Sequence, residues 1–298
     1  MITGNTVFTR KPRITLLDVV LILMLLTAVI YLIYRIRVSV HYHWNWQVIP
    51  QYLFRYDSGS WVPNVLIQGL LTTIRLSIWG TLIATVLGFI MGLCRVNRRL
   101  FFRLIGRTYV ELIRNLPPLV LIFIFYFFVS SQIMPLLGVE EFIRSRSPVT
   151  QQVLGILFEK PSQFTAFLSA IITLAVFEGA YITEIVRAGI QSIDPGQREA
   201  AYALGFTRWQ QMRHVTLPQA IQRIIPPMAG QFISTIKDSA IVSVISIQDL
   251  TFQGMELMAA TYLTFEIWIT ITLLYLVLTL SLSLVFRRLE LHLRRSWT

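Results

Sequence analysis

Six apolar runs, each long enough to cross a lipid bilayer, dominate the sequence. A hydrocarbon core of roughly 30 Å requires about 20 predominantly apolar residues in a helix. The runs lie near residues 15–34, 65–94, 109–130, 164–186, 220–245 and 263–286. The sequence therefore predicts an all-α polytopic membrane protein with six transmembrane helices.

Composition supports the membrane assignment and affects how the net positive charge is interpreted. Apolar residues make up 55% of the 298 residues and charged residues 14%, and the mean hydropathy is +0.64, outside the range of a soluble globular domain. A net charge of +11 would suggest nucleic-acid binding in a soluble chain. Here the arginines lie mainly in short loops between apolar runs, so we expect contact with membrane lipid and none with nucleic acid.

The distribution of basic residues predicts the orientation in the membrane. With the N-terminus inside, the inside segments carry 17 basic residues and the outside segments six. Because short cytoplasmic loops are enriched in Lys and Arg, both termini are expected in the cytoplasm. Arg10, Lys11 and Arg13 precede the first apolar run as in a signal peptide, but the run is long and has no small-x-small cleavage pattern before Tyr34. It is interpreted as an uncleaved anchor.

Motifs for catalysis are missing from the sequence. No Gly-x-x-x-x-Gly-Lys-Ser/Thr occurs, and Lys11, Lys160 and Lys237 all lack a Gly-rich lead-in. Cys94 is the single cysteine, and the pair His41 and His43 is interpreted as interfacial polar residues rather than as a metal site. We therefore expect no enzyme activity, no metal and no cofactor in this chain; any ATP hydrolysis must come from a partner.

A polar, small-residue hairpin at 194–218 separates two of the apolar runs. It contains Glu199-Ala200-Ala201-Tyr202-Ala203-Leu204-Gly205 and, after nine further residues, Val215-Thr216-Leu217-Pro218. Ala200 and Ala201 are expected to offer a face with small side chains, Gly205 permits a turn, and Pro218 stops or restarts a helix. These features predict a docking element for a cytoplasmic partner.

The spacing within this hairpin resembles the EAA signature of bacterial ABC importer permeases, with Val215 where the family more often has Ile. Three further segments resemble elements of the polar amino-acid permeases: Glu111 to Leu119, Ala180 to Arg187, and Lys237-Asp238-Ser239. Asn115-Leu116, Ala240 and Ile241 depart from those elements. Together the matches cover roughly residues 64–286, which is most of the chain.

The resemblance implies a permease subunit of a type I, binding-protein-dependent importer with a five-helix core. Its partners would be two ATPases that bind ATP and Mg²⁺, a second permease, identical or paralogous, and a periplasmic binding protein that delivers a polar amino acid. The location implied is the bacterial inner membrane. The hairpin would be the ATPase-coupling element. Its implied coupling residues are Glu199, Ala200, Ala201, Gly205, Leu217 and Pro218.

The same resemblance sets the expected domain boundaries. Residues 61–290 would form the permease core and residues 291–298 a cytoplasmic tail. Residues 1–60 would be an extension with one transmembrane helix and an outside loop. That loop is rich in Tyr and Trp, which prefer the headgroup level of a membrane.

Charged and polar residues inside the apolar runs are candidates for the substrate pathway, because charges in a membrane are costly unless paired or facing a polar cavity. The candidates are Arg75, Glu178, Tyr181, Lys237, Asp238 and Ser239. Arg75 has an alternative interpretation, in which it snorkels to the outer interface. Lys237 and Asp238 are adjacent and are expected to point in different directions, with a helix break or a pore lining near Ser239.

Helical geometry separates the acidic residues into two roles. Glu178 and Tyr181 share a face, whereas Glu178 and Glu184 lie about 240° apart around the helix and cannot form a simple carboxylate pair. Glu184 can pair with Arg187 instead. Pro117-Pro118 and Pro226-Pro227 are expected to kink or interrupt their helices.

Two other classes of function compete with the importer. An ion-coupled secondary transporter or channel could use Glu178, Glu184 and Asp238, but leaves the hairpin unexplained. A membrane scaffold that only recruits a soluble partner would leave the charges within the membrane unexplained. ATP dependence separates the importer from the ion-driven carrier, and substrate flux separates both from a scaffold.

Overall fold

The computed structural model describes residues 15–39, 42–57 and 59–296, and the chain divides into two compact units, Met1–Asn45 and Trp46–Thr298. The first unit contains helix α1, Leu16–Ser39, whose apolar side chains from Leu16 to Ile30 are exposed along its length. Arg10, Lys11 and Arg13 lie outside the described residues. Residues 46–60 group with the second unit, and the boundaries of the extension and of the permease core stay predictions.

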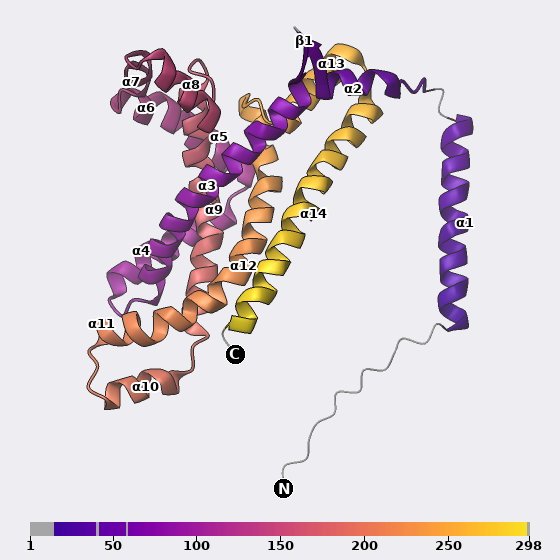
Figure 1. Ribbon diagram of the computed structural model, residues 1–298. Coiled ribbons are helices and arrows are strands. Elements are labelled where there is room, and N and C mark those ends of the chain that lie inside the picture. The colour runs from indigo at the N-terminus through magenta and orange to yellow at the C-terminus, as the bar shows by residue number, and fades with distance from the viewer. Residues whose placement is uncertain (1–14, 40–41, 58, 297–298) are drawn as a thin grey trace. The chain divides into compact units, whose positions relative to one another are not determined.

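Four helical segments among the described residues are long and apolar enough to cross a membrane. Three are single helices: α3 (Val65–Val96), α9 (Phe164–Gln191) and α14 (Thr264–Ser296). The fourth, Pro118–Leu136, joins α5 (Pro118–Phe128), a π-helical turn at Val129–Ile133 and α6 (Met134–Leu136). Figure 1 shows α9 crossing α3, and α12 running between α9 and α14.

The remaining elements connect these spans. Their bounds are α4 Leu100–Asn115, α7 Val139–Arg144, α8 Pro148–Leu157, α10 Pro195–Ala203, α11 Arg208–Gln210, the π-helical turn η3 Gln211–Thr216, α12 Leu217–Asp238, the 3₁₀ helix η4 Ser239–Ile245 and α13 Leu250–Thr261. Ahead of α3 lie the 3₁₀ turn η1 Trp46–Val48, α2 Ile49–Leu53 and an antiparallel hairpin of β1, Phe54–Asp57, and β2, Ser60–Pro63. The fold is mostly helical, and this small hairpin is an addition to the all-α expectation.

The third expected span, 109–130, is wrong in its position. Helix α4 ends at Asn115 and the apolar segment begins only at Pro118. Leu116, which precedes Pro117, has the extended backbone that a following proline imposes (ψ 148°). Pro118 then occupies the first turn of α5, where its missing N–H costs nothing. The first proline pair therefore interrupts the chain's helix as expected, but the crossing segment lies downstream of the break.

The second proline pair behaves differently. Pro226 and Pro227 lie inside α12, which continues from Leu217 to Asp238 without interruption. This helix carries polar and charged residues and is not one of the four apolar segments, while α1 contributes a shorter apolar stretch, Leu16–Tyr31. The count of six crossings therefore stays a prediction.

The core depends on close packing between α3 and α9. A Cβ atom at Gly88 would lie 2.5 Å from Ile182 Cγ2, and one at Gly92 would lie 2.6 Å from Val186 Cγ1. Both distances are shorter than real Cβ contacts, so only glycine permits this approach. We call the contact between these two helices the α3–α9 seam. It holds α9 in place for the functional residues described next.

Candidate translocation pathway and coupling hairpin

The predicted hairpin is present as two short helices joined by a tight turn. Helix α10 is N-capped by Asp194, whose Oδ1 accepts a hydrogen bond of 2.7 Å from the Gly196 N–H, and begins at Pro195. Its other end turns at Gly205, which has φ +80°. There the Phe206 N–H donates to the Ala201 carbonyl and the Gly205 N–H to the Tyr202 carbonyl, a Schellman motif. Gly205 therefore provides the left-handed turn.

The return arm of the hairpin has its own start signal. Thr207 caps α11, and a capping box joins it to Gln210. The chain continues through η3 into α12, where Pro218 occupies the first turn. The two arms are bridged by a 3.4 Å hydrogen bond from Gln219 Nε2 to Gln197 Oε1. These local contacts give the hairpin a defined shape without a partner.

Exposure within the hairpin only partly follows the expectation. Glu199, Ala200, Gly205 and Pro218 are exposed and Leu217 is half-buried. Ala201 is only 3% exposed, so its expected place on the docking face is wrong: its small side chain packs within the chain.

Three apolar side chains on the hairpin were missed by the sequence analysis. Tyr202 and Leu204 are each 76% exposed and Trp209 is 70% exposed. Large exposed apolar groups gathered on one short segment are typical of a protein interaction site. After Ala201, large apolar residues alternate with small ones in the sequence, and this pattern could have indicated Tyr202 and Leu204.

A polar cavity lies between α9 and α12. Its volume is about 410 Å³, and its lining residues are Pro118, Phe177, Tyr181, Gln231, Ser234, Lys237, Asp238 and Ile241. Three of the six candidate pathway residues, Tyr181, Lys237 and Asp238, are therefore brought together in one place. Lys237 and Asp238 line the same cavity although they are adjacent, because α12 ends at Asp238 and gives way to a 3₁₀ helix at Ser239. Near Ser239 a helix break or a pore lining was expected; the structure has a change from α-helix to 3₁₀ helix there, and the chain stays helical to Ile245.

Gln231 and Ser234 were not predicted. They precede Asp238 by seven and four residues, the spacing of a single helix face, so a polar stripe along this helix was the available signal. Gln231 also connects the cavity to Glu178, because its Nε2 donates a 2.7 Å hydrogen bond to Glu178 Oε2. Glu178 is fully buried, and its Oε1 has no hydrogen-bond partner among the described residues.

Glu178 itself is not a lining residue, and neither are the remaining two candidates, Arg75 and Ser239. Arg75 donates a 3.3 Å hydrogen bond to the Phe158 carbonyl and lies 3.9 Å from Glu159. Ser239 is buried and donates to the Ile236 carbonyl at 2.8 Å. Arg75 thus has an acidic partner within the chain, and Ser239 satisfies its hydroxyl locally.

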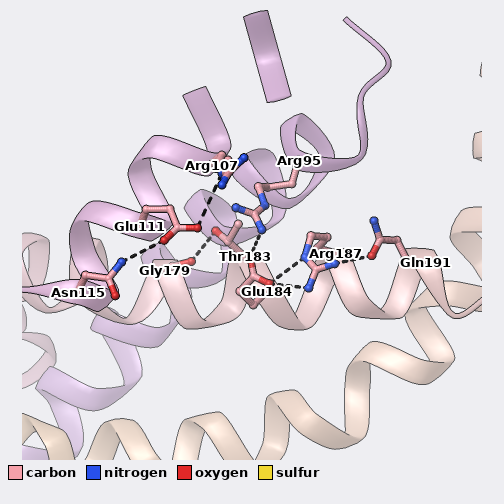
Figure 2. A network of polar contacts seen from close by, with 9 residues as sticks. All are labelled: Arg95, Arg107, Glu111, Asn115, Gly179, Thr183, Glu184, Arg187 and Gln191. Carbon is pink, nitrogen blue, oxygen red and sulfur yellow. Dashed lines mark hydrogen bonds and ion pairs between the residues drawn. The ribbon is translucent and has the colours of Figure 1, made fainter. Parts of the chain in front are cut away.

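Glu184 belongs to an ion-pair network toward the C-terminal end of α9 (Figure 2). Its Oε2 pairs with Arg187 at 2.7 Å, which confirms the predicted pair, and its Oε1 lies 2.8 Å from Arg95 of α3. Arg187 also contacts Gln191. Arg95 was missed because it lies 89 positions away in the sequence. Glu184 is therefore held by two arginines and does not share a site with Glu178.

Comparison with known proteins decides the family. The family described as "Binding-protein-dependent transport system inner membrane component" matches residues 84–295. The chain belongs to this family. It is also 32% identical over 231 residues to the glutamine transport system permease protein GlnP of Escherichia coli K12, with 76% of this chain and 91% of the relative covered. A probable glutamine ABC transporter permease protein, GlnM of Bacillus subtilis, is 32% identical and covers 78% of this chain and 95% of the relative.

Solved structures agree with the assignment to this permease family. An amino acid ABC transporter crystallised with histidines matches with a TM-score of 0.60 and 33% identity, over 76% of this chain and 94% of that one. The MetNI methionine ABC transporter in an inward-facing conformation shares the fold, with a TM-score of 0.56 at 19% identity and the same coverage.

The protein is thus a permease subunit of a binding-protein-dependent ABC importer, a membrane component rather than a catalytic one. Membership of this family implies, in general, ATPase, permease and binding-protein partners. Family membership does not favour the ion-coupled carrier or the channel. Glu178 and Glu184 also have separate partners, Gln231 for the first and two arginines for the second. No cluster of three metal-ligating side chains occurs in the described part of the chain.

Proposed function

We propose that this permease imports a polar amino acid, with glutamine as the first candidate, across a bacterial inner membrane. The names of the relatives support the substrate class. The proposed assembly contains two ATPase subunits, a second permease that is identical or paralogous, and a periplasmic amino-acid-binding protein. The excess of arginines in the inside segments supports cytoplasmic termini.

The observation that carries the proposal is the connection between the hairpin and the cavity. The hairpin joins α9 directly to α12, and these same two helices supply most of the cavity lining, from Phe177 and Tyr181 to Lys237 and Asp238. A partner that moves the hairpin therefore pulls on both walls of the cavity. Type I importers are expected to switch access in this way, as ATP binding and hydrolysis shift a two-state equilibrium.

The cavity has the chemistry that an amino-acid zwitterion requires. Lys237 supplies a positive charge for the α-carboxylate and Asp238 a negative charge for the α-ammonium group. Tyr181, Gln231 and Ser234 add hydrogen-bonding groups for a polar side chain. The volume of about 410 Å³ falls within the roughly 300–1,000 Å³ typical of small-molecule sites. Glu178 positions Gln231 by accepting the hydrogen bond from its Nε2.

Substitutions at the cavity test this pathway in proteoliposomes that contain the complete importer. Asp238→Asn and Lys237→Gln should each raise the KM for uptake by at least tenfold, the effect of losing about 1.4 kcal/mol of binding. Glu178→Gln should change substrate stimulation of the ATPase. Glu111→Gln, an exposed control on α4, should leave the kinetics unchanged. Unaltered KM values for uptake and unaltered substrate stimulation of the ATPase in the Asp238, Lys237 and Glu178 variants would exclude this substrate pathway.

In the proposed coupling role, exposed residues of the hairpin contact the ATPase: Glu199, Ala200, Gly205, Tyr202 and Trp209. Leu217 and Pro218 lie at the base of the return arm.

The substitution Gly205→Asp tests the coupling role. Asp tolerates the left-handed conformation better than most residues, and nothing lies within 4 Å of a Cβ at this position. The variant should therefore fold normally and still lose ATP-dependent uptake.

The matched control is Gly155→Asp, a second glycine with open space around its Cβ, in α8. It should retain uptake. Size-exclusion chromatography with the partner ATPase reads the docking step directly. Normal uptake and normal ATPase retention in Gly205→Asp would contradict the coupling role.

A further inference from the structure

The β1–β2 hairpin has one aromatic face and one polar face. Its register pairs Phe54 with Pro63 and Tyr56 with Trp61. Because side chains alternate along a strand and directly paired residues share a side, these four residues lie on one face. Arg55, Asp57, Ser60 and Val62 occupy the other face, where Arg55 and Asp57 form an ion pair at 3.3 Å.

The aromatic face is exposed to a degree that needs explanation. Tyr56 and Trp61 contact each other edge to face at 5.5 Å, yet they are 66% and 70% exposed, and Phe54 is 44% exposed. A two-stranded hairpin is marginally stable in water unless a face is covered. Apolar exposure of this kind indicates a surface that another phase or molecule covers.

The position of the β1–β2 hairpin indicates what covers its aromatic face. Strand β2 ends at Pro63 and the membrane-length helix α3 begins at Val65. The preceding helix α2 is fixed to the same level, because Ile49 packs in one cluster with Leu66 of α3 and Ile267 of α14. The Asn64 N–H also donates to the Leu53 carbonyl at 2.9 Å. The hairpin therefore lies at the end of two membrane-length helices, close to α13 and the start of α14 (Figure 1).

We propose that Phe54, Tyr56 and Trp61 insert into the phospholipid headgroup region and fix the outer end of α3. Tyr and Trp are suited to this boundary because their rings are apolar and their O–H and N–H groups need polar partners. The aromatic face carries no charged residue, whereas Arg55 and Asp57 on the opposite face remain in water. The proposal depends on the membrane position of α3 and not on the substrate or on the ATPase contact.

Spin labels test which face meets lipid. Cys94, the single cysteine, is replaced by Ser, and one cysteine at a time is introduced at Tyr56 or Trp61, so that the remaining aromatic side chains are retained. Matched labels at Arg55 and Ser60 report the polar face. The full chain is reconstituted into nanodiscs of phosphatidylethanolamine and phosphatidylglycerol. Leu280 of α14 and Arg208 of α11 provide an apolar and a water-exposed reference.

The measured quantity is the ratio of collision rates with oxygen, which concentrates in lipid, and with a nickel chelate, which stays in water. The ratio at positions 56 and 61 should exceed that at positions 55 and 60 severalfold, and it should lie between the two references. Equal ratios on both faces would overturn the proposal. Protection of positions 56 and 61 that appears only when the binding protein is added would also overturn it, in favour of a protein contact.

Discussion

The α3–α9 seam and the α10–α11 hairpin both depend on glycine, for opposite physical reasons. In the seam, Gly88 and Gly92 are needed because side chains of the facing helix occupy the space that a Cβ would fill. In the hairpin, Gly205 has empty space around it and is needed for its φ of +80°. The same residue type therefore fixes tertiary packing in one region and local backbone shape in the other.

This difference separates stability from function. Side chains in the seam are buried within the chain: Ile182 and Val186 of α9 are 0% and 1% exposed. The hairpin leaves Tyr202, Leu204 and Trp209 exposed and gains its order from caps and turns. We infer that substitutions in the seam affect folding first, whereas substitutions in the hairpin affect partner binding first.

The largest expected effect is that of Gly88→Val. Its Cβ would lie 2.5 Å from Ile182 Cγ2 and 3.0 Å from the Gly179 carbonyl oxygen, and overpacking of this kind costs about 1–3 kcal/mol or more. We expect a lower Tm and a smaller monodisperse fraction in detergent. Gly155→Val, where no atom lies within 4 Å, is the control. The double variant Gly88→Val with Ile182→Ala should recover part of the loss; equal Tm values for the two glycine variants would contradict the seam.

Glu184→Gln should have an intermediate effect at the end of the seam. It leaves Arg95 and Arg187, which are 16% and 30% exposed, without a carboxylate. Removing one partner of a fully buried pair costs about 3–5 kcal/mol, and partial solvent access lowers this to about 1–2 kcal/mol. Urea or thermal unfolding in detergent measures the change.

Glu111→Gln provides the comparison for that prediction, because the 3.8 Å pair of Glu111 with Arg107 is 54–68% exposed. Exposed pairs contribute little, so the change should stay within about 0.5 kcal/mol. Both pairs appear in Figure 2. A loss at Glu111 as large as that at Glu184 would show that burial does not set the difference.

Among the substitutions expected to destabilise the protein beyond the Glu111→Gln control, Gly205→Ala has the smallest effect. An alanine with φ near +80° costs about 1 kcal/mol, and Asn should cost less because it tolerates this conformation. Circular dichroism and Tm in detergent distinguish the three residues. A Gly205→Ala variant that is destabilised as strongly as Gly88→Val would remove the distinction between the two regions.

Sequence reasoning was most successful where a signal is local. The hairpin at 194–218 was predicted with a turn at Gly205 and a helix boundary at Pro218, and the structure has a left-handed turn at the first and the start of α12 at the second. The pairing of Glu184 with Arg187 follows from helical spacing in the same way.

The failures come from contacts between distant parts of the chain. Arg95 meets Glu184, and Glu159 meets Arg75, across 89 and 84 positions of sequence, which no local pattern contains. The burial of Ala201 depends on tertiary packing. The crossing placed at 109–130 failed because the apolar pattern was extended across Pro117, and the residue before this proline, Leu116, has an extended backbone that ends α4.

ATP-dependent uptake in proteoliposomes tests the central claim most directly. The chain is reconstituted with its partner ATPase, a second permease and the binding protein, and labelled glutamine uptake is measured without any ion gradient. The account predicts uptake that requires ATP and is lost in Gly205→Asp, while the folded protein remains in the membrane. Uptake driven by an ion gradient in the absence of the ATPase, or unchanged in Gly205→Asp, would contradict it.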